Sequence, residues 1–164
     1  MLNTSRLIIR PWELQDAASF LLLTQDSGFM AHRITDYRQS DLSSAETWIR
    51  NQNGKYAVLN KDSGELIGMG GLTPWTLENE QLVDITYRLK ESVWGKGYGW
   101  ELATALRDYG FQTLDLSQIT ATITPDNIPS KKLAEKLGFR FDKQIILHGV
   151  ATDLFRLLRQ PAET

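Results

Sequence analysis

Three glycines at alternate positions, Gly95, Gly97 and Gly99, stand between an alternating apolar segment and a stretch with helical periodicity. Glycine lets the backbone approach a ligand closely, because it has no side chain and tolerates left-handed conformations. The first N–H groups of the following helix have no partner within that helix, and the helix dipole attracts anions to them. The turn therefore predicts a strand-to-helix junction that binds a phosphate group.

The spacing of this turn differs from that of two common nucleotide-binding motifs. A G-x-G-x-x-G fingerprint has glycine at its sixth position, but the sixth residue counted from Gly95 is Trp100. In a Walker A loop, Gly-Lys is followed by Ser or Thr, whereas Lys96 is followed by Gly97. Asp115 lies at about the right distance for a ribose-binding acid, yet it precedes the next strand pattern instead of ending it. We therefore reject a dinucleotide-binding turn.

Length and composition favour one domain that spans residues 1–164, since 41% of the residues are hydrophobic. The 18 basic and 20 acidic residues nearly balance, which argues against direct nucleic-acid binding. No apolar run approaches the ~20 residues that span a bilayer, and residues 1–10 lack a signal-peptide pattern. We expect a cytoplasmic protein without a membrane partner.

Metal chemistry is not expected in this chain. It contains no cysteine, and its two histidines, His32 and His148, are far apart in the sequence. These counts exclude disulfides, thiolate ligands and cysteine nucleophiles. Chemistry must then use oxygen and nitrogen groups.

Apolar periodicity divides the chain into strand and helix patterns. The expected strands are residues 6–10, 56–59, 65–72, 82–89, 119–124, 139–147 and 151–158. The expected helices are residues 13–24, 43–51, a stretch after Gly99, and a stretch with Pro129 in its first turn that Gly138 ends. Ser43 and Glu46 have the spacing of a capping box, and residues 28–40 have no period and are expected to form a loop that covers a site. This order predicts an α+β domain with a mixed sheet.

Five segments in this order carry a family resemblance over most of the chain: S-R-L-I-I-R-P, D-I-T-Y-R-L, W-G-K-G-Y-G, D-N-I-P-S and L-G-F-R. Together they resemble the GNAT superfamily of acetyl-CoA-dependent N-acetyltransferases, and within it the branch of ribosomal-protein N-terminal acetyltransferases. The resemblance implies a mixed, mostly antiparallel sheet with a central pair of splayed parallel strands and helices on both faces.

The resemblance also implies a binding site for the pyrophosphate of acetyl-CoA in the glycine turn. The family's six-residue loop falls on Trp94, Gly95, Lys96, Gly97, Tyr98 and Gly99. Trp94 replaces the Arg or Gln that is common at the first position. Contacts there are therefore expected to come mainly from backbone N–H groups.

Three further positions are implied to bind the rest of the cosubstrate. Pantetheine inserts between the splayed strands, and an N–H near Leu89 is expected to polarise the thioester carbonyl. Asn127 falls at the position that bonds the pantetheine arm, and Ser130 at the position near the thiol or pyrophosphate. The alternative is that Asn127 and Ser130 are simple helix caps, and capping and binding are compatible.

Asp84 and Ser130 are the candidate catalytic residues. The attacking amine must be neutral, and Asp84 shares a strand face with Thr86 and Arg88 from which it could accept the amine proton. The alternative is a carboxylate that is exposed or paired with Arg88. Many relatives place a Tyr four residues after the late Ser to protonate the thiolate, but this chain has Ala134 there. Ser130 or solvent remains as the donor.

Two groups of side chains are open to either a functional or a structural role. The aromatic and sulfur side chains could line an acceptor pocket or pack in the core, and the basic ones could bind the 3′-phosphate of CoA or form a solvated face. The first group is Trp12, Phe29, Met30, Trp75 and Tyr87, and the second is Lys131, Lys132, Lys136 and Arg140.

The resemblance implies an enzyme that forms a ternary complex and passes the acetyl group directly to a primary amine. The amine partner is either a protein N-terminus or a small molecule, and the enzyme is a monomer or a homodimer. The alternative is a degenerate domain that binds acyl-CoA as a sensor or partner-binding module.

Overall fold

Apolar alternation along the chain produces a single sheet of eight strands in the order β1-β2-β3-β4-β5-β6-β8-β7. The computed structural model describes residues 1–161. The strands are β1 (Leu2–Asn3), β2 (Leu7–Arg10), β3 (Lys55–Asn60), β4 (Leu66–Leu77), β5 (Glu80–Leu89), β6 (Gln118–Ile123), β7 (Arg140–Leu147) and β8 (Val150–Leu158). Every neighbouring pair is antiparallel except β5 and β6, which are parallel. The predicted fold class is confirmed.

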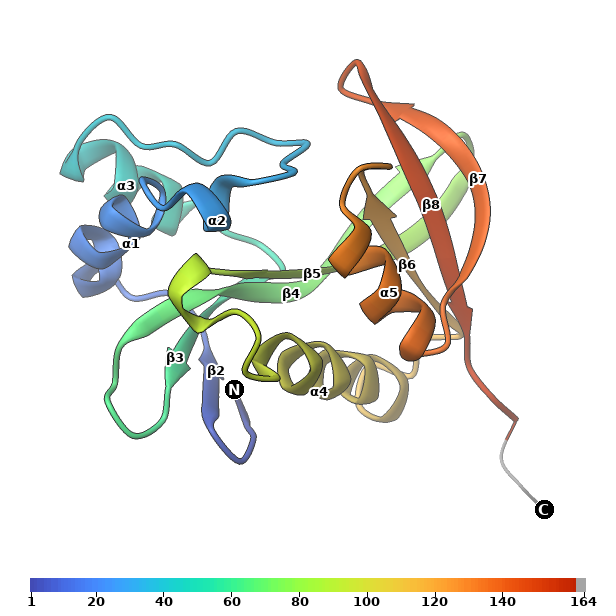
Figure 1. The fold of residues 1–164 in the computed structure, drawn as a ribbon, viewed down its shortest axis with the longest axis horizontal. Coiled ribbons are helices and arrows are strands. Elements are labelled where there is room, and N and C mark those ends of the chain that lie inside the picture. The colour runs from blue at the N-terminus through green and yellow to red at the C-terminus, as the bar shows by residue number, and fades with distance from the viewer. Residues whose placement is uncertain (162–164) are drawn as a thin grey trace.

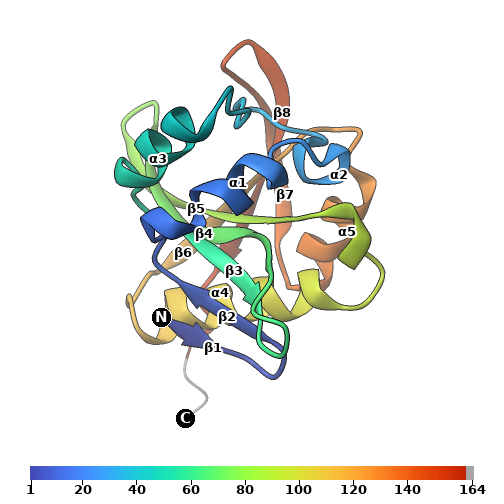
Figure 2. The same cartoon turned by 90° about the vertical axis from the view of Figure 1, so that its left-hand side faces the viewer.

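Helices cover both faces of this sheet (Figure 1). They are α1 (Ala17–Leu23), α2 (Ser27–Met30), α3 (Leu42–Arg50), α4 (Tyr98–Gln112) and α5 (Ile128–Lys136), with the short 3₁₀ turns η1 (Leu14–Asp16) and η2 (Glu91–Val93). Figure 2 shows α1 and α3 on one side of the sheet and α4 on the other. None of the helices within residues 1–161 combines the length and the apolar character needed to cross a membrane.

The two faces have separate apolar cores, because side chains alternate between the faces of a strand. On the α1–α3 face, Phe20 of α1 and Met69 of β4 are fully buried in one cluster. On the α4–α5 face, Leu102 and Leu106 of α4 pack with Ile119 of β6 in the other. The sheet therefore lies between two helical layers, and α4 and α5 pack against its parallel strands.

β5 and β6 pair at only one register position, Asp84 with Thr120. Beyond that position the two strands diverge, so the carboxyl-terminal half of β5 has no β6 residue opposite it. This splay leaves backbone groups on the β6-facing edge of β5 without a strand partner. The gap opens directly before the glycine turn that leads into α4.

Three local expectations differ from the structure. Helix α3 has its N-cap at Asp41, whose side chain accepts from the backbone N–H of Ser44 at 2.8 Å. The capping box therefore joins Asp41 and Ser44, and the expected pair of Ser43 and Glu46 was wrong by two positions. The aperiodic segment 28–40 begins inside the short helix α2, which Asp26 caps. A short additional strand, β1, precedes the first expected one.

Candidate active site

The glycine turn enters α4 through two left-handed residues. Gly95 has φ 75° and Gly97 has φ 83°, a region that side chains rarely allow. Gly97 is the N-cap of α4 and provides no side-chain cap, and the first intrahelical bond runs from the N–H of Glu101 to the carbonyl of Gly97 at 3.1 Å. The N–H groups of residues 98–100 therefore have no partner within the helix. They can donate to an anion at this turn.

A pocket of about 440 Å³ lies over this turn and is called the loop pocket below. Of the nine residues that the sequence predicts to bind the cosubstrate, all but Lys96 line it: Leu89, Trp94, Gly95, Gly97, Tyr98, Gly99, Asn127 and Ser130. Lys96 does not line the pocket, and its carbonyl accepts from Arg6. The structure thus brings together residues from β5, the turn, α4 and α5.

An arginine from the start of the chain holds the turn in place. The guanidinium of Arg6 donates from Nη1 to the carbonyl of Lys96 at 2.9 Å and from Nε to Glu101 at 2.8 Å, and it lies 4.1 Å from the ring centre of Tyr98. Burial opposes ionisation of Glu101, but hydrogen bonds from Thr4 and Arg6 outweigh it and lower the pKa of that carboxyl. These contacts tie the turn and the first residues of α4 to the start of the chain.

Replacing Arg6 with alanine is expected to weaken CoA binding by about three- to tenfold, because one hydrogen bond to the turn is lost. Calorimetry with CoA measures the change, and the Michaelis constant for the acceptor amine is expected to stay the same. Arg50→Ala is the matched control, since Arg50 lies on α3 and pairs with Glu46 of the same helix. Equal CoA affinity of the Arg6 variant and the wild type would contradict this role.

The end of β5 presents Leu89 to the gap. The N–H of Lys90 donates to the carbonyl of Ile67 on β4 at 2.9 Å. Because backbone groups alternate between the two edges of a strand, the N–H of Leu89 points to the opposite edge, which faces the splay. The indole Nε1 of Trp94 donates to the Leu89 carbonyl at 2.9 Å. The turn therefore fixes the orientation of the strand end that carries this N–H.

Two hydroxyl groups meet at the other wall of the gap. Ser130 donates from Oγ to the Tyr87 hydroxyl at 3.1 Å, and the Tyr87 hydroxyl donates to the Ser130 carbonyl at 3.3 Å. Burial raises the pKa of Tyr87 to about 12, so its hydroxyl stays protonated. Asn127 caps α5 by accepting from the N–H of Ser130 at 3.3 Å. The structural alternative for Asn127 therefore holds, and its side chain lines the loop pocket as well.

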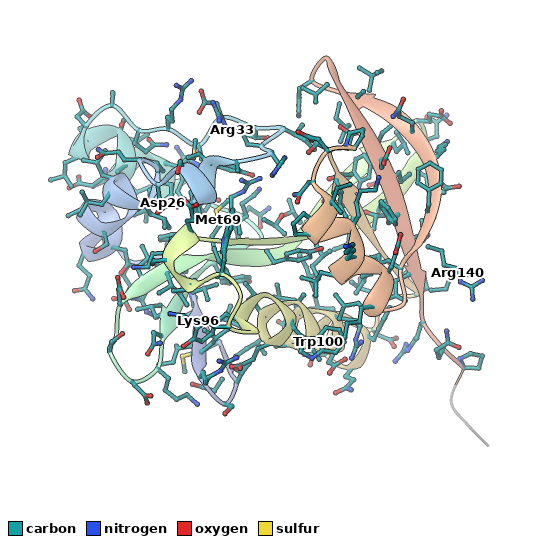
Figure 3. All side chains as sticks on the ribbon, viewed as in Figure 1. Asp26, Arg33, Met69, Lys96, Trp100 and Arg140 are labelled. Atoms are coloured by element: carbon teal, nitrogen blue, oxygen red, sulfur yellow. The ribbon has the colours of Figure 1, made fainter. Side chains whose placement is uncertain are left out.

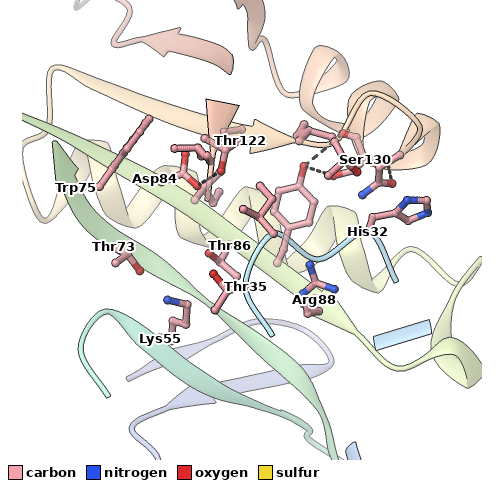
Figure 4. Close-up of a pocket in the computed structure, with 18 of the residues that line it drawn as sticks. His32, Thr35, Lys55, Thr73, Trp75, Asp84, Thr86, Arg88, Thr122 and Ser130 are labelled. Atoms are coloured by element: carbon pink, nitrogen blue, oxygen red, sulfur yellow. Dashed lines mark hydrogen bonds between the residues drawn. The ribbon is translucent and has the colours of Figure 1, made fainter. Parts of the chain in front are cut away.

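A second pocket of about 260 Å³ lies on the other side of the gap and is called the inner pocket below. It is walled by β3, β4, β5 and β6, by the segment after α2 and by the turn between β7 and β8 (Figure 4). Five residues line both pockets: His32, Tyr87, Arg88, Asn127 and Ser130. The two pockets therefore meet where β5 and β6 separate.

Asp84 lines the inner pocket at the last paired position of β5. Both of its carboxylate oxygens accept hydrogen bonds, one from Thr120 Oγ1 at 2.8 Å and one from Thr122 Oγ1 at 2.9 Å. Trp75 extends this chain, because its Nε1 donates to Thr120 Oγ1 at 3.0 Å. Burial raises the pKa of Asp84 to about 7, although the threonine hydrogen bonds favour the ionised form. Such a carboxyl can exchange a proton near neutral pH.

Asp84 is neither freely exposed nor paired with Arg88, so the structural alternative for it was wrong. Arg88 Nη1 donates at 2.6 Å to each of two carbonyls, those of Phe29 and Ala31. These bonds anchor the segment after α2 over the gap. Thr86 lies between Asp84 and Arg88 on β5 and lines the inner pocket with them.

The aromatic candidates divide between pocket and core. Trp75 and Tyr87 line the inner pocket. Trp12, Phe29 and Met30 pack in the core beneath α1 and α3.

The basic candidates do not gather at the loop pocket. Lys131 pairs with Asp153 at 3.0 Å, and Lys136 lies 4.5 Å from the ring centre of Trp100. Arg140 lies at the end of the molecule away from Lys96 (Figure 3). A joint contact of these side chains with one phosphate is therefore not supported.

Comparison with known proteins agrees with this geometry. The model of the GNAT acetyltransferase domain matches residues 6–140. The chain belongs to the GNAT acetyltransferase family. It is 33% identical to p20, an uncharacterized N-acetyltransferase of Bacillus licheniformis, over 85% of this chain and 82% of the relative. The protein is therefore a GNAT-family N-acetyltransferase.

Solved GNAT structures share the fold over nearly the full length. A GNAT-family acetyltransferase from Bacillus anthracis has a TM-score of 0.82 at 25% identity and covers 96% of this chain and 97% of its own. A ribosomal L7/L12 α-N-protein acetyltransferase, solved in complex with coenzyme A, has a TM-score of 0.77 at 16% identity and covers 94% and 95%. The second likeness concerns the fold alone.

The features of the GNAT loop pocket fit a coenzyme A diphosphate. Its turn combines N–H donors with two left-handed glycines, and a Cβ placed on Gly95 would meet nothing within 4 Å. Within residues 1–161, no group of three or more His, Cys, Asp or Glu side chains is arranged to hold a metal ion. The two pockets combine backbone amides, hydroxyls and the Asp84 carboxyl with the cationic side chains of Lys55 and Arg88.

Sequence reasoning missed four contributors to this GNAT site. Arg6 holds the turn, Thr120 and Thr122 hold Asp84, and Lys55 lines the inner pocket. Arg6 lies within the quoted opening segment S-R-L-I-I-R-P, which is a signal, although its role was not apparent. The threonines lie on a strand that was expected, but their pairing with Asp84 depends on the neighbouring strand. No pattern in the sequence around Lys55 indicates a role for it in the site.

Proposed function

We propose that this GNAT enzyme transfers the acetyl group of acetyl-CoA directly to a primary amine within a ternary complex. The observation that carries the proposal is the junction of the two pockets, which share His32, Tyr87, Arg88, Asn127 and Ser130. One pocket has the features of a diphosphate site, and the other contains a carboxyl with a pKa near 7. A thioester reaching the gap from the first pocket would meet an amine from the second.

Each step of the transfer has a candidate group on this chain. Acetyl-CoA supplies the thioester. The N–H of Leu89 faces the gap and is suited to stabilise the negative charge on the carbonyl oxygen as the amine nitrogen attacks. Asp84 takes the proton that the amine loses, directly or through water. The C–N bond forms, the C–S bond breaks, and the thiolate of CoA leaves.

The departing thiolate takes its proton from the Ser130 hydroxyl, which Tyr87 supports. Ala134 of α5 has no hydroxyl and packs fully buried in the core, so that position offers no proton donor. Tyr87 instead brings a phenol from β5 to within 3.1 Å of Ser130 Oγ. This phenol stays protonated and holds the Ser130 hydroxyl in place, and Ser130 regains its proton from solvent after transfer. A thiolate with a reference pKa of about 8.5 leaves readily, so a weak donor suffices.

Tyr87→Phe is expected to lower kcat by about tenfold with little change in the Michaelis constant for acetyl-CoA. The effect is smaller than the roughly 10²–10⁴-fold of full acid–base catalysis, because the thiolate is a good leaving group. Steady-state rates of the two single variants and of the double variant with Ser130→Ala measure it. If the two hydroxyls act as one unit, the double variant is no slower than Ser130→Ala alone. Additive losses would contradict the pairing.

Thiol release in the presence of acetyl-CoA and candidate amines tests the proposed function directly. The panel contains peptides with free N-termini, amino acids, polyamines and aminoglycosides. A ribosomal-protein acetyltransferase among the structural relatives makes a protein N-terminus one acceptor to include. Amine-dependent thiol release supports the proposal. Tight acetyl-CoA binding without acetylation of any amine in the panel would favour a non-catalytic acyl-CoA-binding domain instead.

A further inference from the structure

The inner pocket contains a lysine whose ammonium has no hydrogen-bonding partner within residues 1–161. Lys55 lies on β3 opposite Gly71 of β4, and it lines the inner pocket together with Thr73. Burial lowers the pKa of Lys55, the carboxyl of Asp84 opposes this shift, and no hydrogen bond contributes. A partly desolvated ammonium is costly unless an anion pairs with it. Asp84 already receives two hydroxyl donors, so Lys55 remains available to a ligand.

The charges that line the inner pocket do not balance. Two cations, Lys55 and Arg88, face one carboxyl, that of Asp84. Arg88 donates to two backbone carbonyls, which carry no net charge, so its positive charge is not neutralised. His32 pairs with Asp126 at the pocket rim at 3.3 Å. Since Asp84 has a pKa of about 7, it is only partly ionised at neutral pH, and the pocket is electropositive.

A simple alkylamine is a poor occupant of such a pocket. Amines are mostly protonated near neutral pH, and a second positive charge would be repelled by Lys55 and Arg88. An acceptor that also carries a negative group removes this repulsion. The volume of about 260 Å³ is below the roughly 300–1,000 Å³ of pockets for drug-sized ligands. The occupant is therefore small.

Building on the proposed acetyl transfer, we infer that the acceptor is a small molecule with both a primary amine and a carboxylate, and that Lys55 binds the carboxylate. Figure 4 shows Lys55 and Ser130 on opposite sides of the pocket, with Asp84, Thr86 and Arg88 along the strand between them. When the carboxylate of the acceptor binds Lys55, the amine at its other end reaches Asp84 and the gap. Lys55 is a binding residue that sets specificity for the acceptor.

The test compares amines that differ only in charge. Thiol release is measured for α- and ω-amino acids with one to five carbons between the amine and the carboxylate, and for the matching carboxamides. For at least one chain length, the carboxylate is expected to have a kcat/KM about tenfold or more above that of its amide, through a lower KM. Lys55→Gln is expected to remove this preference, and Lys55→Arg to keep most of it. Lys143→Gln is the matched control, because Lys143 is exposed on β7.

A binding measurement makes the inference independent of turnover. The probe is the same carboxylic acid with its amine replaced by a methyl group, titrated calorimetrically into the protein saturated with CoA. Binding that Lys55→Gln weakens about tenfold, with unchanged CoA affinity, supports the inference even if no amine is acetylated, in which case only the proposed function fails. Equal use of acids and amides, an unchanged preference in Lys55→Gln, or turnover confined to peptides would overturn it.

Discussion

Asp84→Asn is expected to lower kcat/KM for acetyl transfer by about 10²–10⁴-fold, the range for removal of a general base. Asparagine keeps the size of the side chain and one acceptor oxygen for Thr120 or Thr122, but it cannot take up the amine proton. Thiol release with an excess of acceptor measures the loss, and CoA affinity is expected to stay the same. Asp62→Asn is the control, since Asp62 is exposed in the turn between β3 and β4.

The same carboxyl sets the expected pH dependence of the rate. Since the pKa of Asp84 is about 7, the basic form is depleted as the pH falls below 7, and kcat/KM is expected to fall about tenfold per pH unit there. The profile of the wild type below pH 7 measures this. Asp84 is excluded as the base if the residual rate of Asp84→Asn shows the same fall below pH 7. A wild-type rate that is constant down to pH 5 would exclude it as well.

The Asp84 carboxyl also makes the stability of the folded protein depend on pH. The pKa of Asp84 rises from the ordinary aspartate value of 3.8 in the unfolded chain to about 7 in the folded protein. Between these pH values the folded state binds more protons than the unfolded state, so stability falls as the pH rises from about 4 to 7. Asparagine does not titrate. Urea unfolding is therefore expected to show Asp84→Asn gaining stability relative to the wild type over this pH range.

Gly97→Val is expected to weaken CoA binding by about 10- to 100-fold, because the turn loses charge-assisted hydrogen bonds to the diphosphate. Gly97 has φ 83°, which a β-branched residue rarely adopts, and a Cβ there would lie 3.3 Å from Nη2 of Arg6. The backbone must shift, and the N–H groups that begin α4 shift with it. Calorimetric titration with CoA measures the affinity.

A second glycine separates the effect of strain from the effect on the ligand. Gly64 has φ 73° in the turn between β3 and β4, and a Cβ there would meet nothing within 4 Å. Gly64→Val therefore introduces the same backbone strain far from the loop pocket. It is expected to lose stability in thermal unfolding yet bind CoA as the wild type does. Unchanged CoA affinity in Gly97→Val would show that the diphosphate is bound elsewhere.

Local patterns predicted the elements of the fold well, because each depends on neighbours in the chain. Strand alternation in residues 82–89 and the glycine turn after it led to β5 and α4 in their observed places. The errors are also local. The expected start of α3 at Ser43 rests on the capping-box spacing of Ser43 and Glu46, whereas the cap is formed two residues earlier by Asp41, which has an equally suitable side chain.

The glycine turn was readable from the sequence alone, since left-handed glycines and the free N–H groups of a helix start are properties of consecutive residues. The gap in the sheet, by contrast, exists because β6 and β5 pair at Asp84 and then diverge. The residues that line the gap come from segments that are distant in the sequence. Tyr87 meets Ser130 across 43 positions, and Arg6 meets Glu101 across 95. Lys55 faces Asp84 because β3, β4 and β5 are neighbours in the sheet. No periodicity records such contacts, so the glycine turn was determined by the sequence, while the inner pocket was decided by tertiary packing.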